Sequence, residues 1–135
     1  MPVKPGYRVW GRTGLYEPLV ASALGRSGRD LRTRAVDALA LRAGERVLDL
    51  GTGTGLSLLP LAAVVGPSGR VIGLDPYPEM LARARARLPA GAAIELVVGR
   101  GEELPLADGS LDAAISTFGL TAVDDPARVL REVRR

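Results

Sequence analysis

The sequence predicts an α/β fold in which helices flank a doubly wound, mostly parallel sheet of about four strands. Three observations predict it. Short runs rich in Val, Leu and Ile alternate along the chain with stretches of helical periodicity. These runs lack strict apolar–polar alternation, which is typical of strands buried on both faces of a parallel sheet. A glycine-rich turn also joins the first run to the next helix, as in α/β proteins that bind a ligand at a strand end.

Four runs are predicted to be strands, and they span residues 46–50, 70–75, 93–99 and 111–116. The first, second and fourth runs are each followed by a helical stretch, and in such folds the crossovers between parallel strands are right-handed. The carboxyl ends of all four strands should therefore meet at one edge of the sheet, where such folds bind ligands.

Four helices are predicted, over residues 29–41, 56–65, 78–88 and 124–135. Pro78 and Glu79 favour a helix start, because proline suits the first turn and an acid complements the helix dipole. The helix at 124–135 opens with acids and ends in bases, which also matches the dipole. Pro60 is tolerable only in a first turn, so the helix at 56–65 should begin near Gly55.

Composition limits the chemistry that this chain can perform. The 135 residues suffice for one domain with a core, and they include no cysteine and no histidine. Thiolate nucleophiles, disulfides and sulfur-ligated metals are excluded, and we expect no metal site. Any chemistry must therefore use carboxylates, hydroxyls, Arg, backbone groups or a bound cofactor.

Charge and hydropathy bear on partners and location. The net charge of +3 arises in the first 46 residues, where basic side chains outnumber acidic ones. Nucleic acid is not an expected partner, because no aromatic base-stacking platform interleaves these Arg residues. No apolar run has the length of a membrane span and no secretory signal is visible, so we expect a cytoplasmic protein.

The stretch VLDLGTGTGL, residues 47–56, carries an acid followed by evenly spaced glycines, Asp49-x-Gly51-x-Gly53-x-Gly55. Glycine allows positive φ and a close ligand approach to the backbone. Dinucleotide-binding proteins have G-x-G-x-x-G, but the third position here is Leu56. A carboxylate at the strand end would repel a diphosphate and suits a positively charged ligand.

These residues resemble the class I S-adenosylmethionine-dependent methyltransferases, especially the branch that includes the ubiquinone/menaquinone biosynthesis enzymes. A second stretch, GRGEELPLADGSLDAAIS, is similar to the family pattern G-D-A-E-x-L-P-F-x-D-x-S-F-D. The positions that match are Gly99, Glu102, Leu104, Pro105, Asp108, Ser110 and Asp112. The resemblance extends from Glu45 to Arg135, and it implies a Rossmann-like fold.

The resemblance implies that S-adenosylmethionine is the cofactor and S-adenosylhomocysteine the product. The residues expected to bind it are Asp49, Gly51, Thr52, Gly53, Gly55, Asp75, Pro76, Arg100, Gly101, Glu102 and Ser116. Asp75 ends the second strand, where an acid accepts hydrogen bonds from ribose hydroxyls. Pro76 and Tyr77 map onto residues that flank the adenine.

The chain departs from the family pattern at two places. Arg100 stands where the family has an acid that accepts from the adenine amino group, and Arg has no acceptor capacity. Glu102 or Glu103 could substitute, backbone and stacking could hold the adenine, or affinity could be weakened. Thr121 and Ala122 stand where family members often carry His or Asn, which puts substrate activation there in doubt.

The favoured function is methyl transfer from S-adenosylmethionine to a small-molecule acceptor. The alternatives are a catalytically silent cofactor-binding or scaffolding module and, less favoured, a nicotinamide-binding domain. The catalytic residue is unknown, and the candidates for a proton acceptor are Glu17, Asp124 and Tyr16. Aromatic side chains that could form a lid over the cofactor are Tyr7, Trp10 and Tyr16.

The expected organisation is an N-terminal helical or lid segment, residues 1–44, and a cofactor-binding α/β domain, residues 45–135. Relative to the family, this domain lacks the usual last three strands, so the sheet should be incomplete. The fourth strand would then form an exposed apolar edge, and such edges favour pairing with another chain. We therefore expect a homodimer, a larger assembly, or a partner that covers this edge.

Overall fold

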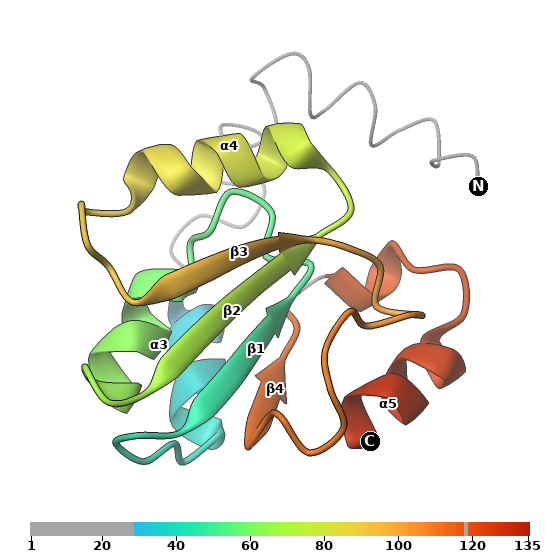
Figure 1. The fold of residues 1–135 in the computed structure, drawn as a ribbon, viewed down its shortest axis with the longest axis horizontal. Coiled ribbons are helices and arrows are strands. Elements are labelled where there is room, and N and C mark those ends of the chain that lie inside the picture. The colour runs from blue at the N-terminus through green and yellow to red at the C-terminus, as the bar shows by residue number, and fades with distance from the viewer. Residues whose placement is uncertain (1–28, 118) are drawn as a thin grey trace.

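The chain forms a four-stranded parallel sheet in the order β3-β2-β1-β4 (Figure 1). The computed structural model describes residues 29–117 and 119–135. The strands are β1 (Arg46–Leu50), β2 (Arg70–Asp75), β3 (Ile94–Val98) and β4 (Ala113–Ile115). The predicted doubly wound sheet is confirmed. The last two strands are shorter than the predicted runs, because the ends of those runs lie beyond the ladder pairing.

The helices also follow the prediction, and two of them, α3 and α5, start two residues later than predicted. Residues 29–38 are helical. They are followed along the chain by α3 (Leu58–Val65), α4 (Pro78–Arg87), the short 3₁₀ helix η1 (Gly119–Thr121) and α5 (Pro126–Arg134). Pro60 is the third residue of α3, which confirms its expected place in the first turn. Asp125 caps α5 by accepting a hydrogen bond of 2.9 Å from the backbone N–H of Arg128.

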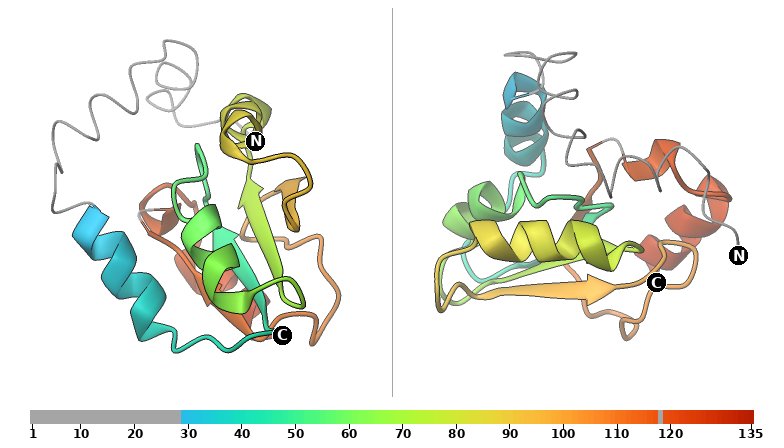
Figure 2. Two further views of the ribbon diagram at one scale, coloured as in Figure 1. Left: turned by 90° about the vertical axis from the view of Figure 1, so that its left-hand side faces the viewer. Right: turned by 90° about the horizontal axis from the view of Figure 1, so that it is seen from above.

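The sheet is buried on both faces, which explains why its strands read as continuous apolar runs. The helix at 29–38, α3 and α4 cover one face, while α5 and the loop after β3 cover the other (Figure 2). Val47 and Val71 belong to the first core, and Leu48 and Ile72 belong to the second. Val36 is buried in the first core, so the helix before β1 packs against the sheet. The predicted division of the chain after residue 44 stays a prediction.

An ion pair joins the starts of β1 and β4. The guanidinium of Arg46 contacts both carboxylate oxygens of Asp112 at 3.0 Å, and the backbone N–H of Arg46 donates to the same carboxylate at 2.8 Å. These hydrogen bonds hold the pKa of Asp112 at about 2. The pair aligns two strands that are far apart in sequence.

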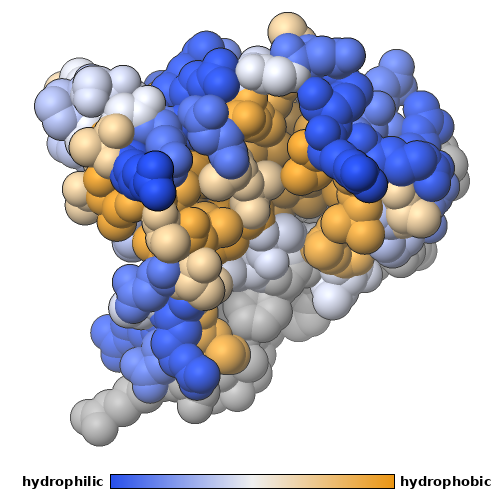
Figure 3. Space-filling model, turned by 90° about the horizontal axis from the view of Figure 1, so that it is seen from below, coloured by the Kyte–Doolittle hydropathy of each residue, from blue (hydrophilic) through white to orange (hydrophobic). Residues whose placement is uncertain are grey.

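β4 forms one edge of the sheet, as predicted. In the described part of the chain, β4 pairs with β1 alone. Ala113 and Ala114 are half-buried and Ile115 is buried. The underside of the molecule shows apolar surface between charged groups (Figure 3). None of the helices among residues 29–117 and 119–135 is long and apolar enough to cross a membrane.

Two glycines allow the backbone after β1 to cross the backbone after β4. Gly51 has a φ of +71°, and a Cβ there would lie 2.7 Å from the Cα of Gly119. A Cβ on Gly119 would lie 2.5 Å from the carbonyl oxygen of Leu50. Both distances are shorter than a van der Waals contact, so any side chain at either position would push the strand ends apart.

We predict that Gly51→Ala lowers the free energy of unfolding by about 3 kcal/mol, since left-handed backbone costs about 1–2 kcal/mol and overpacking adds about 1–3 kcal/mol. Gly91→Ala is the matched control, because Gly91 has a φ of +78° and no neighbour within 4 Å of its Cβ position. It should cost only about 1 kcal/mol. Urea denaturation measures both, and equal losses would contradict the role of the crossing.

Candidate functional site

The carboxyl ends of the four strands gather the predicted site residues at one edge of the sheet (Figure 1). The glycine loop, residues 51–55, follows β1, and residues 75–77 end β2. Residues 99–103 follow β3, and Ser116 follows β4. This convergence was predicted, because parallel strands share the edge at which they end.

The glycine loop turns its N–H groups toward the protein. Four of them donate to protein acceptors, and they belong to Gly51, Thr52, Gly53 and Gly55. The carbonyl of Leu74 accepts from the first two at 2.8 and 3.0 Å, and the carboxylate of Asp75 accepts from the third at 2.9 Å. A pyrophosphate site needs loop N–H groups that point at the ligand. This loop therefore does not fit a diphosphate.

The three loop glycines serve different purposes. All have positive φ, and a Cβ on Gly55 would lie 2.9 Å from both Ala84 and Leu58. Gly51 and Gly55 are thus required by packing as well as by backbone conformation. A Cβ on Gly53 would meet only the end of Met80, at 4.0 Å. Gly53 is the position in the loop where a ligand can approach the backbone.

Asp49 lies buried below this loop with 2% of its surface exposed. Its carboxylate accepts a hydrogen bond of 2.6 Å from the hydroxyl of Thr52. Burial raises the pKa of Asp49 to about 6, although the bond from Thr52 and the charge of Arg32 both oppose the shift. Because it is buried, Asp49 can act on a ligand through its charge rather than by direct contact.

Arg32 is a residue of this site that sequence reasoning missed. It lies one turn before the buried Val36, at the end of the helix that points toward the carboxyl edge of the sheet (Figure 2). Its charge acts on Asp49. The helical spacing to Val36 was visible in the sequence, but the strand end that this helix reaches was not.

Asp75 is oriented by two backbone hydrogen bonds at the end of β2. Its Oδ2 accepts from Gly53 at 2.9 Å and its Oδ1 accepts from Tyr77 at 3.0 Å. Burial raises the pKa of Asp75, and these two hydrogen bonds oppose the rise. Each carboxylate oxygen has lone pairs beyond the one used here, so the pair of oxygens can accept from two ribose hydroxyls.

At the end of β3, Arg100 pairs with acids rather than projecting alone. Its Nη2 lies 2.6 Å from Oδ2 of Asp124 and 3.5 Å from Oε1 of Glu102. The same Glu102 oxygen accepts from the backbone N–H groups of Asp124 and Asp125 at 2.8 and 3.4 Å. Burial acts to raise the pKa of Glu102, but hydrogen bonds lower it below its usual value. Glu102 therefore fastens the loop after β3 to the start of α5.

Two further predicted residues have structural contacts of their own, and a third is exposed. The hydroxyl of Ser116 donates to the carbonyl of Leu50 at 2.8 Å. Gly101 leaves room for the side chains of Leu50 and Val129, which its Cβ would meet at 3.1 and 3.2 Å. Pro76 is exposed at the end of β2. Cofactor contacts by these residues stay predictions.

Several sequence-based candidates lie outside the described residues, namely Tyr7, Trp10, Tyr16 and Glu17. Thr121 ends η1 and is exposed. Residues 29–117 and 119–135 contain no group of three or more carboxylates that could hold a metal ion.

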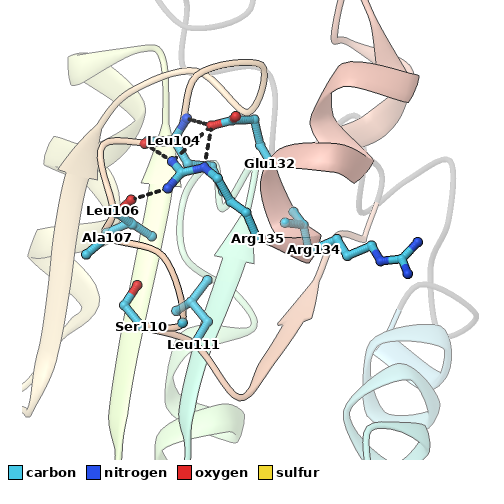
Figure 4. Close-up of a pocket in the computed structure, with 10 residues that line it drawn as sticks. Leu104, Leu106, Ala107, Ser110, Leu111, Glu132, Arg134 and Arg135 are labelled. Atoms are coloured by element: carbon cyan, nitrogen blue, oxygen red, sulfur yellow. Dashed lines mark hydrogen bonds and ion pairs between the residues drawn. The ribbon is translucent and has the colours of Figure 1, made fainter.

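A separate hollow of about 160 Å³ lies between α5 and the loop that precedes β4 (Figure 4). Arg135 closes one side by donating to the carbonyls of Leu104 and Leu106, both at 2.7 Å. The hydroxyl of Ser110 is buried there without a hydrogen-bond partner. This hollow is lined by residues other than those at the strand ends, and the sequence contained no signal for it.

The comparisons with known proteins agree with this geometry. A family model described as a methyltransferase domain matches residues 48–135. The ubiquinone/menaquinone biosynthesis C-methyltransferase UbiE of Citrifermentans bemidjiense is 38% identical over 113 residues, covering 80% of this chain and 48% of that protein.

Two solved structures share the fold. A SAM-dependent methyltransferase from Aquifex aeolicus superposes with a TM-score of 0.71 at 28% identity, over 77% of this chain and 56% of that one. The other structure is a complex from Haloferax volcanii between the Trm112 methyltransferase activator and its proposed methyltransferase. One of its chains superposes with a TM-score of 0.79 at 28% identity, covering 99% of this chain and 56% of that one. The present chain thus spans about half the length of these relatives. With the matched residues and the shared fold, it belongs to the methyltransferase domain family.

Proposed function

We propose that this chain binds S-adenosylmethionine and takes part in methyl transfer to a small-molecule acceptor, with S-adenosylhomocysteine as the product. One observation carries the proposal. The glycine loop directs four N–H groups into the protein and lies beside two carboxylates, Asp49 and Asp75. Such a loop repels a diphosphate and suits a ligand that carries positive charge. The residues present therefore fit this cofactor better than a dinucleotide.

Each residue has a task that its geometry supports. S-adenosylmethionine, when bound, supplies a methyl group on a positively charged sulfur that departs as a neutral thioether. Asp75 would hold the ribose hydroxyls, and Gly53 would let the ligand lie against the backbone. The charge of Asp49 would favour the cationic amino-acid end of the ligand. The chain then aligns the reacting atoms and excludes water, which accounts for most of the catalysis that such a transfer needs.

The acceptor is proposed to be a small molecule because UbiE, 38% identical to this chain, is named for ubiquinone/menaquinone biosynthesis. The catalytic group is open, since Asp124 is paired with Arg100 and the other proton-acceptor candidates lie outside the described residues. Transfer of a labelled methyl group from S-adenosylmethionine to acceptors of several classes tests for turnover. Binding without turnover would indicate the catalytically silent module instead.

We also propose that the β4 edge pairs with a second copy of the chain. The support is that β4 pairs with β1 alone in the described part of the chain and ends in the apolar residue Ile115. Size-exclusion chromatography with light scattering tests this, and a clean monomer would contradict it. The cytoplasmic location stays a prediction, which cell fractionation would check.

Asp75→Ala should weaken the binding of S-adenosylhomocysteine by about 1–3 kcal/mol, because the ribose loses a charge-assisted acceptor. Isothermal titration calorimetry measures this affinity. Glu79→Gln is the matched control, since it removes an exposed acid four residues away and should leave the affinity unchanged. Titration with NADH should show no comparable binding. Unchanged affinity in folded Asp75→Ala would overturn the assignment of Asp75.

Asp49→Asn should stabilise the protein at neutral pH and weaken cofactor binding. The folded-state pKa of Asp49 is raised from 3.8 to about 6, so the folded protein binds this proton more tightly than the unfolded chain. Protonated Asp49 therefore contributes to the free energy of unfolding below about pH 4, and this contribution is lost as the pH rises through 6. By pH 8 the buried charge costs about 2–3 kcal/mol, which the variant recovers.

Urea denaturation at pH 4 and pH 8 measures this difference. The stability that Asp49→Asn gains over the parent should vanish at pH 4, where Asp49 and the Asn that replaces it are both neutral in the folded protein. Asp112→Asn is a control of opposite sign, because the pKa of Asp112 is held at about 2 and its charge stabilises the folded state. A variant at position 49 that is less stable than the parent at pH 8 would contradict the buried-charge account.

A further inference from the structure

An ion pair lies at the candidate site just beyond the end of β3. Nη2 of Arg100 lies 2.6 Å from Oδ2 of Asp124, and each side chain is 39% exposed. The two residues come from different segments, the loop after β3 and the loop before α5. The pair is therefore accessible from solvent and can meet a ligand.

Glu102 holds both members of this pair in place. Its side chain is only 9% exposed, and its Oε1 accepts from the backbone N–H of Asp124 at 2.8 Å and from Arg100 at 3.5 Å. A site whose side chains are already positioned loses less conformational freedom when a ligand binds. Glu102 itself is committed to these bonds, which leaves Asp124 as the exposed carboxylate of the cluster.

The position of the pair follows from the sheet. β3 lies next to β2, with Val98 in register with Asp75, so Arg100 lies just beyond the neighbour of the proposed ribose-binding acid. The charges of Asp75, Arg100 and Asp124 all act on the hydroxyl of Tyr77. A ribose held at Asp75 would therefore place its base next to the loop that carries Arg100.

The chemistry of the pair matches one edge of adenine. That edge is the Watson–Crick edge, which carries the amino group, a donor, beside the ring nitrogen N1, an acceptor. Asp124 and Arg100 offer an acceptor and a donor side by side. Within the described part of the chain, Oδ1 of Asp124 accepts no hydrogen bond, and a carboxylate has capacity for several.

We propose that the Arg100–Asp124 pair reads the adenine edge of the cofactor, with Asp124 accepting from the amino group and Arg100 donating to the adjacent ring nitrogen. This inference rests on the proposed binding of S-adenosylmethionine. It explains how a chain with Arg at position 100 recognises adenine: the acceptor comes from the loop before α5, and Arg100 both positions it and supplies the donor.

The test compares two ligands by isothermal titration calorimetry, S-adenosylhomocysteine and S-inosylhomocysteine. The second carries a carbonyl oxygen in place of the amino group and a ring N–H in place of the accepting nitrogen, so both hydrogen bonds are reversed. The parent chain should prefer S-adenosylhomocysteine by about tenfold or more. Asp124→Ala should weaken S-adenosylhomocysteine by about tenfold and change the inosine analogue by less than about twofold.

Asp37→Asn is the matched control, because it removes an exposed acid from the helix at 29–38 and should leave the ratio of the two affinities unchanged. If Asp124→Ala does not fold, as judged by circular dichroism, Asp124→Asn replaces it and should lower the ratio by about threefold, since it keeps one acceptor. An equal loss for both ligands, or an unchanged ratio, would overturn the inference while leaving cofactor binding intact. Failure of the folded parent chain to bind S-adenosylhomocysteine would overturn the proposed function itself, and this inference with it.

Discussion

The candidate site depends on the bonding of the glycine loop to the end of β2. The carbonyl of Leu74 and the carboxylate of Asp75 together accept from three consecutive N–H groups of the loop. These bonds engage the N–H groups that a diphosphate would need, and they hold the carboxylate of Asp75 in a fixed orientation. The close crossing of Gly51 and Gly119 then brings the segment after β4 to the same place. One set of backbone contacts thus connects three strand ends.

The site retains features that do not favour stability. Asp49 is almost fully buried, and a single hydroxyl hydrogen bond from Thr52 only partly offsets the cost of its charge. A buried carboxylate with a perturbed pKa at a strand end is typical of functional sites. By contrast, the Arg46–Asp112 pair at the opposite end of the sheet is exposed and has a purely architectural role. The proposed binding residues and this aligning ion pair therefore lie at opposite ends of the sheet.

The loop after β3 and the start of α5 behave as one unit. Glu102 connects them through backbone hydrogen bonds, and the Arg100–Asp124 pair lies on the outer side of that connection. A departure from the family pattern at position 100 is thereby accommodated without an unpaired charge. Family membership establishes the fold, whereas the choice of an acceptor would depend on side chains that vary around a common scaffold.

The sequence by itself determined the alternation of strands and helices along the chain, the parallel sheet and the glycine loop at the end of β1. Those features follow from local periodicity and from backbone conformations that only glycine adopts readily. Only the tertiary structure decided that the loop N–H groups point inward, that Arg32 acts on Asp49, and that Asp124 pairs with Arg100. These contacts join residues far apart in the chain. Their existence depends on how helices and loops pack over the sheet, which no local pattern encodes.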